Sequence, residues 1–311
     1  DLNQHSNASK DEIRNRSICD MFEPGSVFKV VTASAILDEN KVGEQDKIFC
    51  ENGEYKVTRH VLHDHTAHGW LTFQEVIEQS SNIGTCKAAQ VLGAELLSRY
   101  IKSFGFGSKT GIDMPGEISG SAKDLRYWSK SSMWAIPMGQ EVGVTAMQLA
   151  SAISTIGNGG NLMKPYIVKE IRNSSGEPIK VFSPVMIRKV LSPEAAARVK
   201  KVLIGVIENG TGKMATVPDF TAAGKTGTGQ KVEPNGMYSH SKFVASFIGF
   251  APAEDPRVAI VVTVDEPRGT YYGGTVSAPV FKNVAADVLK YLKTKQSSNE
   301  VVVMNEFKRT N

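Results

Sequence analysis

The sequence lacks the features that mark several classes of protein. It has three cysteines, Cys19, Cys50 and Cys86, which are too few and too irregularly spaced for a disulfide framework or a zinc ribbon. No apolar run approaches membrane-spanning length, and no leader peptide is visible. Basic residues are scattered without interleaved aromatics, so the net charge of +4 does not indicate a nucleic-acid partner. What remains is a globular protein of ordinary composition.

The apolar segments predict the fold class. Residues 28–37 are apolar nearly all round, which is typical of a helix buried at the centre of a domain. Residues 243–250 and 258–264 are continuously apolar and β-branched, and their short connection makes them antiparallel strands. Strands of this kind are covered on both faces. We therefore expect an α/β domain with a small antiparallel sheet between helices, an adjoining all-α region, and a last helix over residues 278–293.

Other elements follow from capping and turn residues. We expect a hairpin over residues 47–62 around an Asn-Gly turn, and a hairpin of strands near 166–171 and 179–182. Thr72 starts a helix with a capping box, and Thr145 caps another that ends near residue 156. Single helices are predicted over residues 87–104 and 193–208.

Four histidines fall between His60 and His68, and Asp64 lies among them. Imidazoles with a carboxylate can bind zinc. No pair of histidines at helical spacing and no cysteine partner accompanies them, so a polar loop before a helix is the interpretation we favour. We expect neither a metal nor another cofactor.

The segment Glu23–Lys29 has the pattern of an activated serine. A Pro-Gly pair stops the preceding chain, Ser26 stands where a helix would begin, and Lys29 follows one turn later on the same face. A neutral lysine at this spacing can remove the serine proton, and a helix N-terminus favours the developing negative charge. The same Ser-x-x-Lys pattern recurs at Ser239 and Lys242, so this motif alone is weak evidence.

Two further motifs complete a set, Ser80-x-Asn82 and Lys225-Thr226-Gly227. Each also has a second copy, at Ser297/Asn299 and at Lys109-Thr110-Gly111, but those copies lie in a presumed tail and in a Gly/Pro-rich loop. Residues 225–228 precede two apolar strands and are expected to form an edge strand of the sheet.

In this order the motifs make chemical sense. Ser26 attacks a carbonyl carbon, Lys29 accepts its proton, and Ser80 relays the proton to the leaving amine. Asn82 can hold a substrate amide, while Lys225 and Thr228 offer a positive charge and a hydroxyl to a carboxylate. Backbone N–H groups at Ser26 and on the 225–228 strand can form an oxyanion hole.

The sequence resembles the class B penicillin-binding proteins, whose transpeptidase domains carry these three motifs in this order. The resemblance covers roughly residues 15–293. It rests on Glu23-Pro24-Gly25-Ser26-Val27-Phe28-Lys29, Gln79-Ser80-Ser81-Asn82-Ile83-Gly84, Phe104-Gly105-Phe106-Gly107, Met138-Gly139-Gln140, Ala223-Gly224-Lys225-Thr226-Gly227-Thr228-Gly229 and Ser246-Phe247-Ile248-Gly249-Phe250.

The resemblance implies a penicillin-binding-protein/serine β-lactamase-like transpeptidase fold and a serine acyltransferase that cross-links peptidoglycan. Ser26 would attack a stem peptide ending in D-Ala-D-Ala, and an amine of a second stem would accept the acyl group. Thr226, Gly227 and Thr228 would bind the substrate with Lys225, and β-lactam antibiotics would acylate Ser26. The implied location is the extracytoplasmic face of the cell membrane, in partnership with a polytopic glycosyltransferase and other cell-wall synthesis proteins. Division is favoured over elongation.

The chain departs from the family pattern at its start. Transpeptidase domains of this family open with a strand hairpin that is not found here, so we expect residues 1–293 to form a domain without that hairpin and residues 294–311 to form a tail. An exposed sheet edge would follow.

Four alternatives to transpeptidation can be compared with the motifs. A class A β-lactamase needs a Glu-x-x-Leu-Asn loop that residues 117–121 do not supply, and a class D enzyme favours Ser-x-Val at residues 80–82. A D,D-carboxypeptidase and a non-catalytic β-lactam sensor or scaffold share the same motifs and stay open.

Overall fold

The computed structural model describes residues 8–9, 11–57 and 60–309. Its main sheet has three antiparallel strands in the order β11 (Ala223–Val232), β12 (Tyr238–Ala251) and β13 (Val258–Asp265). Thr226 on β11 pairs with Phe247 on β12, which pairs in turn with Val262 on β13. The predicted antiparallel pair and the predicted edge strand at residues 225–228 are both confirmed.

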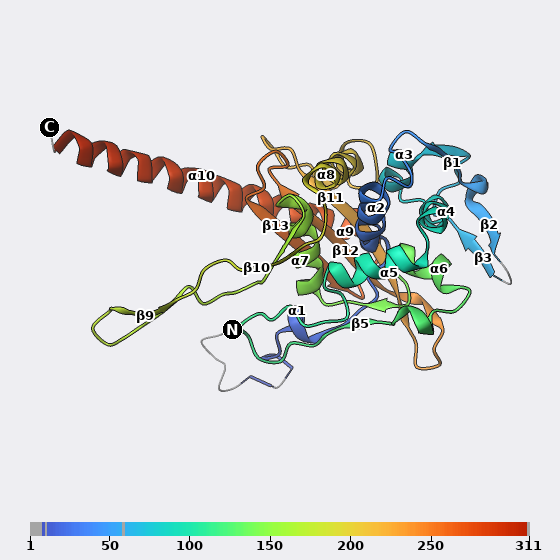
Figure 1. The fold of residues 1–311 in the computed structure, drawn as a ribbon, viewed down its shortest axis with the longest axis horizontal. Coiled ribbons are helices and arrows are strands. Elements are labelled where there is room, and N and C mark those ends of the chain that lie inside the picture. The colour runs from blue at the N-terminus through green and yellow to red at the C-terminus, as the bar shows by residue number, and fades with distance from the viewer. Residues whose placement is uncertain (1–7, 10, 58–59, 310–311) are drawn as a thin grey trace.

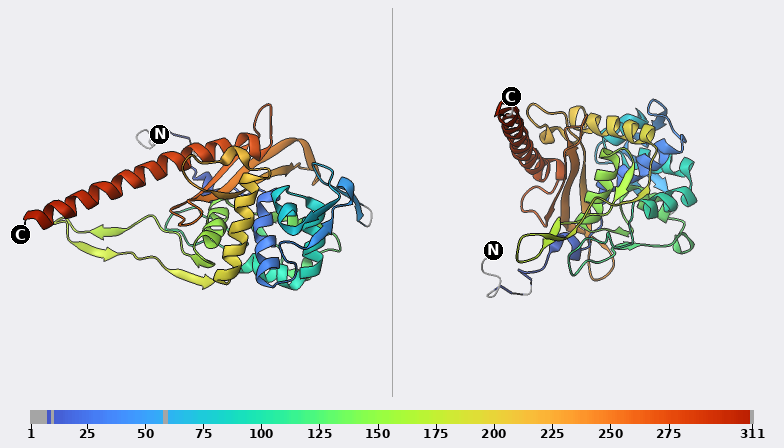
Figure 2. Two further views of the ribbon diagram at one scale, coloured as in Figure 1. Left: turned by 90° about the horizontal axis from the view of Figure 1, so that it is seen from above. Right: turned by 60° about the vertical axis from the view of Figure 1, so that its left-hand side comes forward.

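Helices cover both faces of this sheet. The helices α7 (Ala146–Gly157) and α8 (Pro193–Glu208) contact one face, and α10 (Ala278–Arg309) contacts the other, as the right-hand view of Figure 2 shows. Successive β12 side chains alternate between the two layers. Phe247 packs against Phe281 of α10, whereas Ile248 belongs to the larger core beneath α2, α7 and α8. Burial on both faces explains why residues 243–250 of β12 are apolar nearly throughout.

An all-α region adjoins the sheet (Figure 1). It contains α2 (Lys29–Asp38), α3 (Phe73–Glu78), α4 (Asn82–Leu92), α5 (Ala94–Ser103) and α6 (Ser132–Ala135). In α2 every residue from Lys29 to Leu37 is buried, as its sequence predicts. The single helix predicted over residues 87–104 is wrong, because Gly93 has φ +90° and separates α4 from α5. A left-handed residue of this kind cannot continue a helix.

The hairpin predicted over residues 47–62 is also wrong. Strand β1 (Lys47–Phe49) pairs with β4 (Trp70–Thr72), and β2 (Glu54–Val57) pairs with β3 (His60–His63). Residues Glu51–Gly53 form a 3₁₀ turn in which Glu51 and Asn52 have positive φ. This turn sends β2 away from β1, so each strand finds its partner further along the chain.

The remaining elements frame the domain. Thr72 and Thr145 form capping boxes at α3 and α7, and α8 has its predicted bounds. The other short elements are α1 (Arg16–Cys19), α9 (Gly273–Val276), the 3₁₀ helices η2 (Gly25–Phe28), η4 (Leu125–Tyr127), η5 (Ile136–Met138) and η6 (Lys213–Ala215), and the paired strands β5 (Ser121–Ala122) and β6 (Val142–Gly143). Helix α10 continues through the expected tail as far as Arg309. None of the helices in the described ranges combines the length and apolarity needed to cross a membrane.

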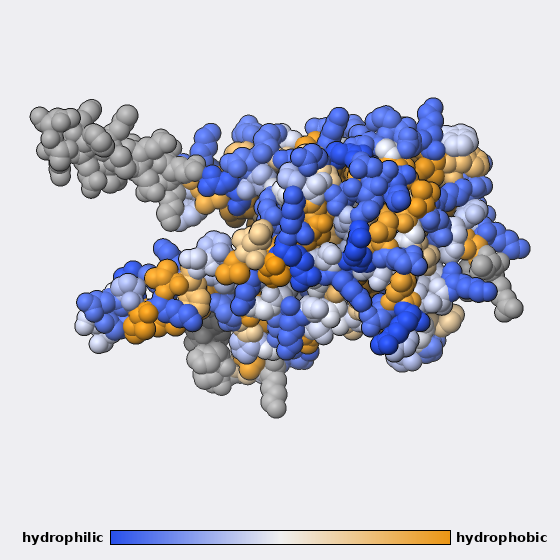
Figure 3. Space-filling model, in the orientation of Figure 1, coloured by the Kyte–Doolittle hydropathy of each residue, from blue (hydrophilic) through white to orange (hydrophobic). Residues whose placement is uncertain are grey.

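A slender arm projects from the domain beside α7 (Figure 1). It is built from β7 (Asn161–Met163) with β10 (Met186–Lys189) at its base and the predicted hairpin of β8 (Glu170–Arg172) and β9 (Pro178–Val181) at its tip. Apolar side chains such as Ile171, Ile179 and Val181 are exposed along it (Figure 3).

Candidate active site

Ser26 lies in the 3₁₀ turn η2, which runs directly into α2. Gly25 begins the turn with φ +57°, and its N–H donates to the Gly139 carbonyl at 3.1 Å. The helix expected to begin at Ser26 therefore opens with one turn of 3₁₀ helix, and the α-helix itself begins at Lys29. Within the described part of the chain no hydrogen bond engages Ser26 Oγ, which leaves the hydroxyl available to a ligand.

Lys29 is fully buried one turn after Ser26. Its Nζ donates to the Ser80 carbonyl at 2.6 Å, to Asn82 Oδ1 at 2.8 Å and to Ser80 Oγ at 3.3 Å. Burial lowers the pKa of Lys29 to about 8, against an opposing effect of the negative charge on Asp64. An appreciable fraction of this amine is therefore neutral near neutral pH, as a general base requires.

Ser80 and Asn82 lie at the junction of α3 and α4. Ser80 has φ +60°, an uncommon conformation for a residue with a side chain. Ser81 caps α4, and Asn82 is the first residue of that helix. Both ends of the Asn82 amide are engaged by protein, because Oδ1 accepts from Lys29 and Nδ2 donates to the His63 carbonyl at 2.9 Å.

Lys225 approaches the same serine from β11. Its side chain is fully buried, and Nζ donates to Ser80 Oγ at 2.9 Å and to the Thr226 carbonyl at 3.1 Å. Burial, followed by repulsion from Lys29, holds the pKa of Lys225 well below its ordinary value. Two lysines from opposite ends of the chain thus converge on one hydroxyl. The structure places the Lys225 amine on Ser80 rather than on the cleft wall.

Glycine allows β11 to lie against the serine turn. A Cβ at Gly227 would stand 2.7 Å from Val27 Cγ1, 2.9 Å from Val27 N and 3.0 Å from the Pro24 carbonyl oxygen. A Cβ at Gly25 would similarly stand 2.9 Å from the Thr228 carbonyl oxygen. The third residue of the Lys-Thr-Gly motif therefore sets the separation between the strand and Ser26.

We expect Gly227→Ala to slow acylation of Ser26 by penicillin roughly 100-fold, because a displacement of about 1 Å at a reacting group has an effect of this size. The second-order rate constant for labelling with fluorescent penicillin measures it. Gly69→Ala is the matched control, since a Cβ at Gly69 would come no closer than 3.6 Å to its neighbours and Gly69, like Gly227, has no positive φ. Equal rates for Gly227→Ala and wild type would contradict the close-approach explanation.

Ser26 lies where two hollows meet. One, of about 480 Å³, is lined by Thr211, Lys213, Thr226, Thr228 and Tyr272, among others. The other, of about 310 Å³, shares Ser26, Asn82 and Thr228 with the first and extends to Glu23, Met138 and Gln230. A hollow of about 520 Å³ beside Arg16 and Lys231 contains none of the three motifs. An extended substrate can therefore lie across Ser26 with one part in each hollow.

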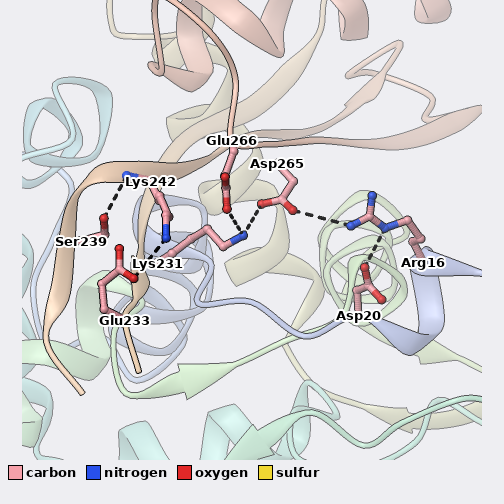
Figure 4. A network of polar contacts seen from close by, with 8 residues as sticks. All are labelled: Arg16, Asp20, Lys231, Glu233, Ser239, Lys242, Asp265 and Glu266. Atoms are coloured by element: carbon pink, nitrogen blue, oxygen red, sulfur yellow. Dashed lines mark hydrogen bonds and ion pairs between the residues drawn. The ribbon is translucent and has the colours of Figure 1, made fainter. Parts of the chain in front are cut away.

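The second Ser-x-x-Lys copy has a different role. Figure 4 shows Ser239 and Lys242 in a polar network at the far end of the sheet, where Ser239 Oγ accepts from the Lys242 N–H at 3.1 Å. The Lys242 amine pairs with Glu233, and Lys231 pairs with Asp265 and Glu266. Arg16 joins Asp265 to Asp20 in the same network. Ser239 is thus committed to a backbone bond in a network of ion pairs.

The sequence did not identify several residues of the cleft. Thr211 and Tyr272 reach it from loops and Lys213 from the 3₁₀ helix η6 (Lys213–Ala215), none of which has a distinctive sequence pattern. Asp64 was considered only as a metal ligand, and across the described ranges no three His, Cys, Asp or Glu side chains form a metal-binding group. His65 instead lies against the Tyr272 ring, with centroids 4.8 Å apart.

Comparisons with known proteins agree with this geometry. The model of the penicillin-binding protein transpeptidase domain matches residues 2–286. Stage V sporulation protein D of Bacillus subtilis is 39% identical over 292 residues, which are 93% of this chain and 45% of that protein. The probable peptidoglycan D,D-transpeptidase PenA of Neisseria flavescens is 32% identical over 97% of this chain and 74% of its own length. The chain thus spans about half the length of the first of these relatives.

Solved structures show the same fold. The transpeptidase domain of Burkholderia pseudomallei penicillin-binding protein 3 has a TM-score of 0.80 at 33% identity, covering 90% of this chain and 82% of that one. Penicillin-binding protein 3 of Mycobacterium tuberculosis, complexed with aztreonam, has a TM-score of 0.85 at 30% identity and covers 94% of this chain and 67% of that one.

Proposed function

Because this chain belongs to the class B penicillin-binding protein transpeptidase family, we propose that it cross-links peptidoglycan stem peptides through an acyl-enzyme on Ser26. The observation that carries this proposal is the convergence of Lys29 and Lys225 on Ser80 beside an unengaged Ser26 hydroxyl. The residues come from three distant segments, and each of the three motifs contributes to one cleft.

Acylation begins at Ser26. Neutral Lys29 takes the hydroxyl proton as Oγ attacks the carbonyl carbon of the penultimate D-alanine, and a C–O bond forms. Ser80 passes its proton to the departing nitrogen and takes the one that Lys29 received, and the C–N bond to the terminal D-alanine breaks. Asn82 and Lys225 support this step by holding Lys29 and Ser80 in place. An amine of a second stem peptide then attacks the ester carbonyl, the C–O bond to Ser26 breaks as the amide of the cross-link forms, and the proton that the amine loses returns to Ser26 Oγ through Lys29.

The negative oxygen that develops during each attack needs donors. The backbone N–H of Ser26 and the exposed edge of β11 lie side by side, because Gly25 and Gly227 let the two segments approach. Donors fixed in this way need no rearrangement as charge develops.

Hydroxyl groups and one cation line the part of the cleft that we assign to the terminal carboxylate. Thr226 Oγ1 and Thr211 Oγ1 are 2.7 Å apart, and Thr228 Oγ1 accepts the Gly273 N–H at 3.2 Å. Gly227 brings this wall close to Ser26, and Lys213 supplies the positive charge that sequence reasoning assigned to Lys225. In this arrangement Lys225 does not contact the carboxylate. It acts there only through the electric field of its amine and through its hydrogen bond to Ser80.

Our proposals for inhibitors, location, partners and cellular role rest on membership of the family. β-Lactams are expected to acylate Ser26, as the complexes of the Mycobacterium tuberculosis protein with aztreonam and ampicillin suggest. We place the domain on the extracytoplasmic face of the cell membrane, with a polytopic glycosyltransferase and other cell-wall synthesis proteins as partners. A role in division rather than elongation stays a prediction.

The test is turnover of a stem peptide ending in D-Ala-D-Ala with and without an acceptor amine. We expect release of one D-alanine together with a new amide to the acceptor, both detected by mass spectrometry. Release of D-alanine with hydrolysis alone would identify a D,D-carboxypeptidase. Acylation by penicillin without peptide turnover would identify a sensor or scaffold.

A further inference from the structure

Asp64 is a carboxylate beside the site that the mechanism above does not use. It follows β3, and its own N–H donates to the Gly53 carbonyl at 3.0 Å, which fixes its backbone. Its carboxylate accepts three hydrogen bonds from the start of α4. The donors are Ser81 Oγ at 2.5 Å, the Asn82 N–H at 2.5 Å and the Ile83 N–H at 3.0 Å.

These bonds lead directly to the catalytic amine. Asp64 holds the backbone of Asn82, whose Oδ1 accepts from Lys29 Nζ at 2.8 Å. It also orients Ser81, whose Oγ accepts the Gly84 N–H at 2.9 Å and so caps α4. Ser80, whose backbone has φ +60°, lies immediately before Ser81, whose side chain is held by Asp64. Strained conformations persist only where their surroundings hold them firmly, and Asp64 supplies that support on the α4 side.

We propose that Asp64 is a positioning residue of the acylation step, which holds the Ser80–Asn82 turn and, through Asn82, the amine of Lys29. This proposal rests on the function proposed for Ser26 and Lys29. Asp64 thus does more than stabilise the start of α4. Asn82, whose N–H donates to Asp64, also accepts the hydrogen bond from Lys29 Nζ.

The charge of Asp64 gives this role a distinctive effect. The ionisable groups that act on Lys29 are Asp64, Cys86, Cys50 and, from β11, Lys225. Burial raises the pKa values of both thiols, that of Cys86 to about 12, so they are uncharged at neutral pH. Asp64 is thus the negative charge that favours the protonated form of Lys29. Removing this charge makes Lys29 neutral at lower pH.

The experiment measures the second-order rate constant for acylation by fluorescent penicillin between pH 5 and pH 10. In Asp64→Asn, Oδ1 can still accept both N–H groups and Nδ2 can donate to Ser81 Oγ, but the charge is gone. We expect the acid limb of its pH–rate profile, where the acylation rate rises with pH, to lie at lower pH than that of wild type by about one pH unit or less. We expect Asp64→Ala to lower the plateau rate roughly 10- to 100-fold, because the turn loses its anchor.

Ser192→Ala is the matched control, since Ser192 caps α8 in the same way through the Ala195 N–H but is absent from the cleft. It should lower the melting temperature while the rate and pH profile stay those of wild type. A wild-type pH profile and plateau in Asp64→Asn would overturn the proposal, even if Asp64→Ala does not fold. Rate losses that merely follow the melting temperature, without a shifted acid limb, would likewise overturn it. Failure of the wild type to be acylated would instead refute the proposed function.

Discussion

Replacement of Ser26 by alanine is expected to abolish covalent labelling by fluorescent penicillin. The hydroxyl is the only atom of that side chain able to form the ester, and the variant retains the apolar packing of Val27 and Phe28 around it. The fold should be unaffected, because no described hydrogen bond depends on Ser26 Oγ. Labelling followed by gel fluorescence and a melting curve of the same sample measures both.

Ser239→Ala is the matched control for this variant. Ser239 belongs to the same sequence pattern, but its Oγ accepts the Lys242 N–H in the network of Figure 4, and it lines neither of the hollows that contain Ser26. It should label at the wild-type rate. Persistent labelling of Ser26→Ala would refute the nucleophile assignment.

Lys29→Ala is expected to reduce the acylation rate by roughly 10²- to 10⁴-fold, the usual contribution of a general base. The variant removes the amine and leaves the Ser80 carbonyl and Asn82 Oδ1 without their donor, while Lys225 still donates to Ser80 Oγ. Stopped-flow or gel-based labelling measures the rate, and Lys231→Ala controls for loss of a lysine, here a half-buried one in the ion-pair network of β11. A loss of less than about tenfold would contradict the role of Lys29 as base.

The pH dependence follows from the lowered pKa of Lys29. Only the neutral amine can accept a proton, so wild-type acylation should rise with pH through a midpoint at about 8, where this group titrates. Lys29→Ala should lose this dependence. The unfolded chain retains the ordinary value of 10.5 and binds more protons between these two values, so Lys29 makes stability rise with pH across that window. An acylation rate independent of pH in the wild type would contradict the assignment.

The motif residues could be predicted from sequence because their chemistry depends on short spacings. Ser26 and Lys29 are one helical turn apart, and Lys225 lies near the start of a strand, β11, whose apolar neighbouring strands identify the sheet. Asp64 could not be assigned in this way, since its partners at residues 81–83 become neighbours only after β3 and α4 pack together. The role of Lys225 was similarly hidden. Its position in the motif suggested a carboxylate partner, but its contact with Ser80 spans 145 residues.

The fold shows the same difference between local features, which the sequence predicts, and long-range contacts, which it does not. Capping residues correctly placed the starts of α3 and α7, because a cap acts within a few residues. The pairing of β1 with β4 could not be predicted, since it depends on the conformation of a single turn at Glu51–Gly53. The break at Gly93 depends equally on local backbone geometry, which a pattern of apolar residues does not reveal.

The most direct test of Ser26 as the nucleophile is to locate the acyl group on the wild-type protein. The protein is incubated with penicillin, digested, and sequenced by tandem mass spectrometry. The added mass is expected on Ser26, in a single equivalent that persists for many minutes after free penicillin is removed. An adduct on Ser80 or Ser239, or no stable adduct on any serine, would contradict the proposed mechanism.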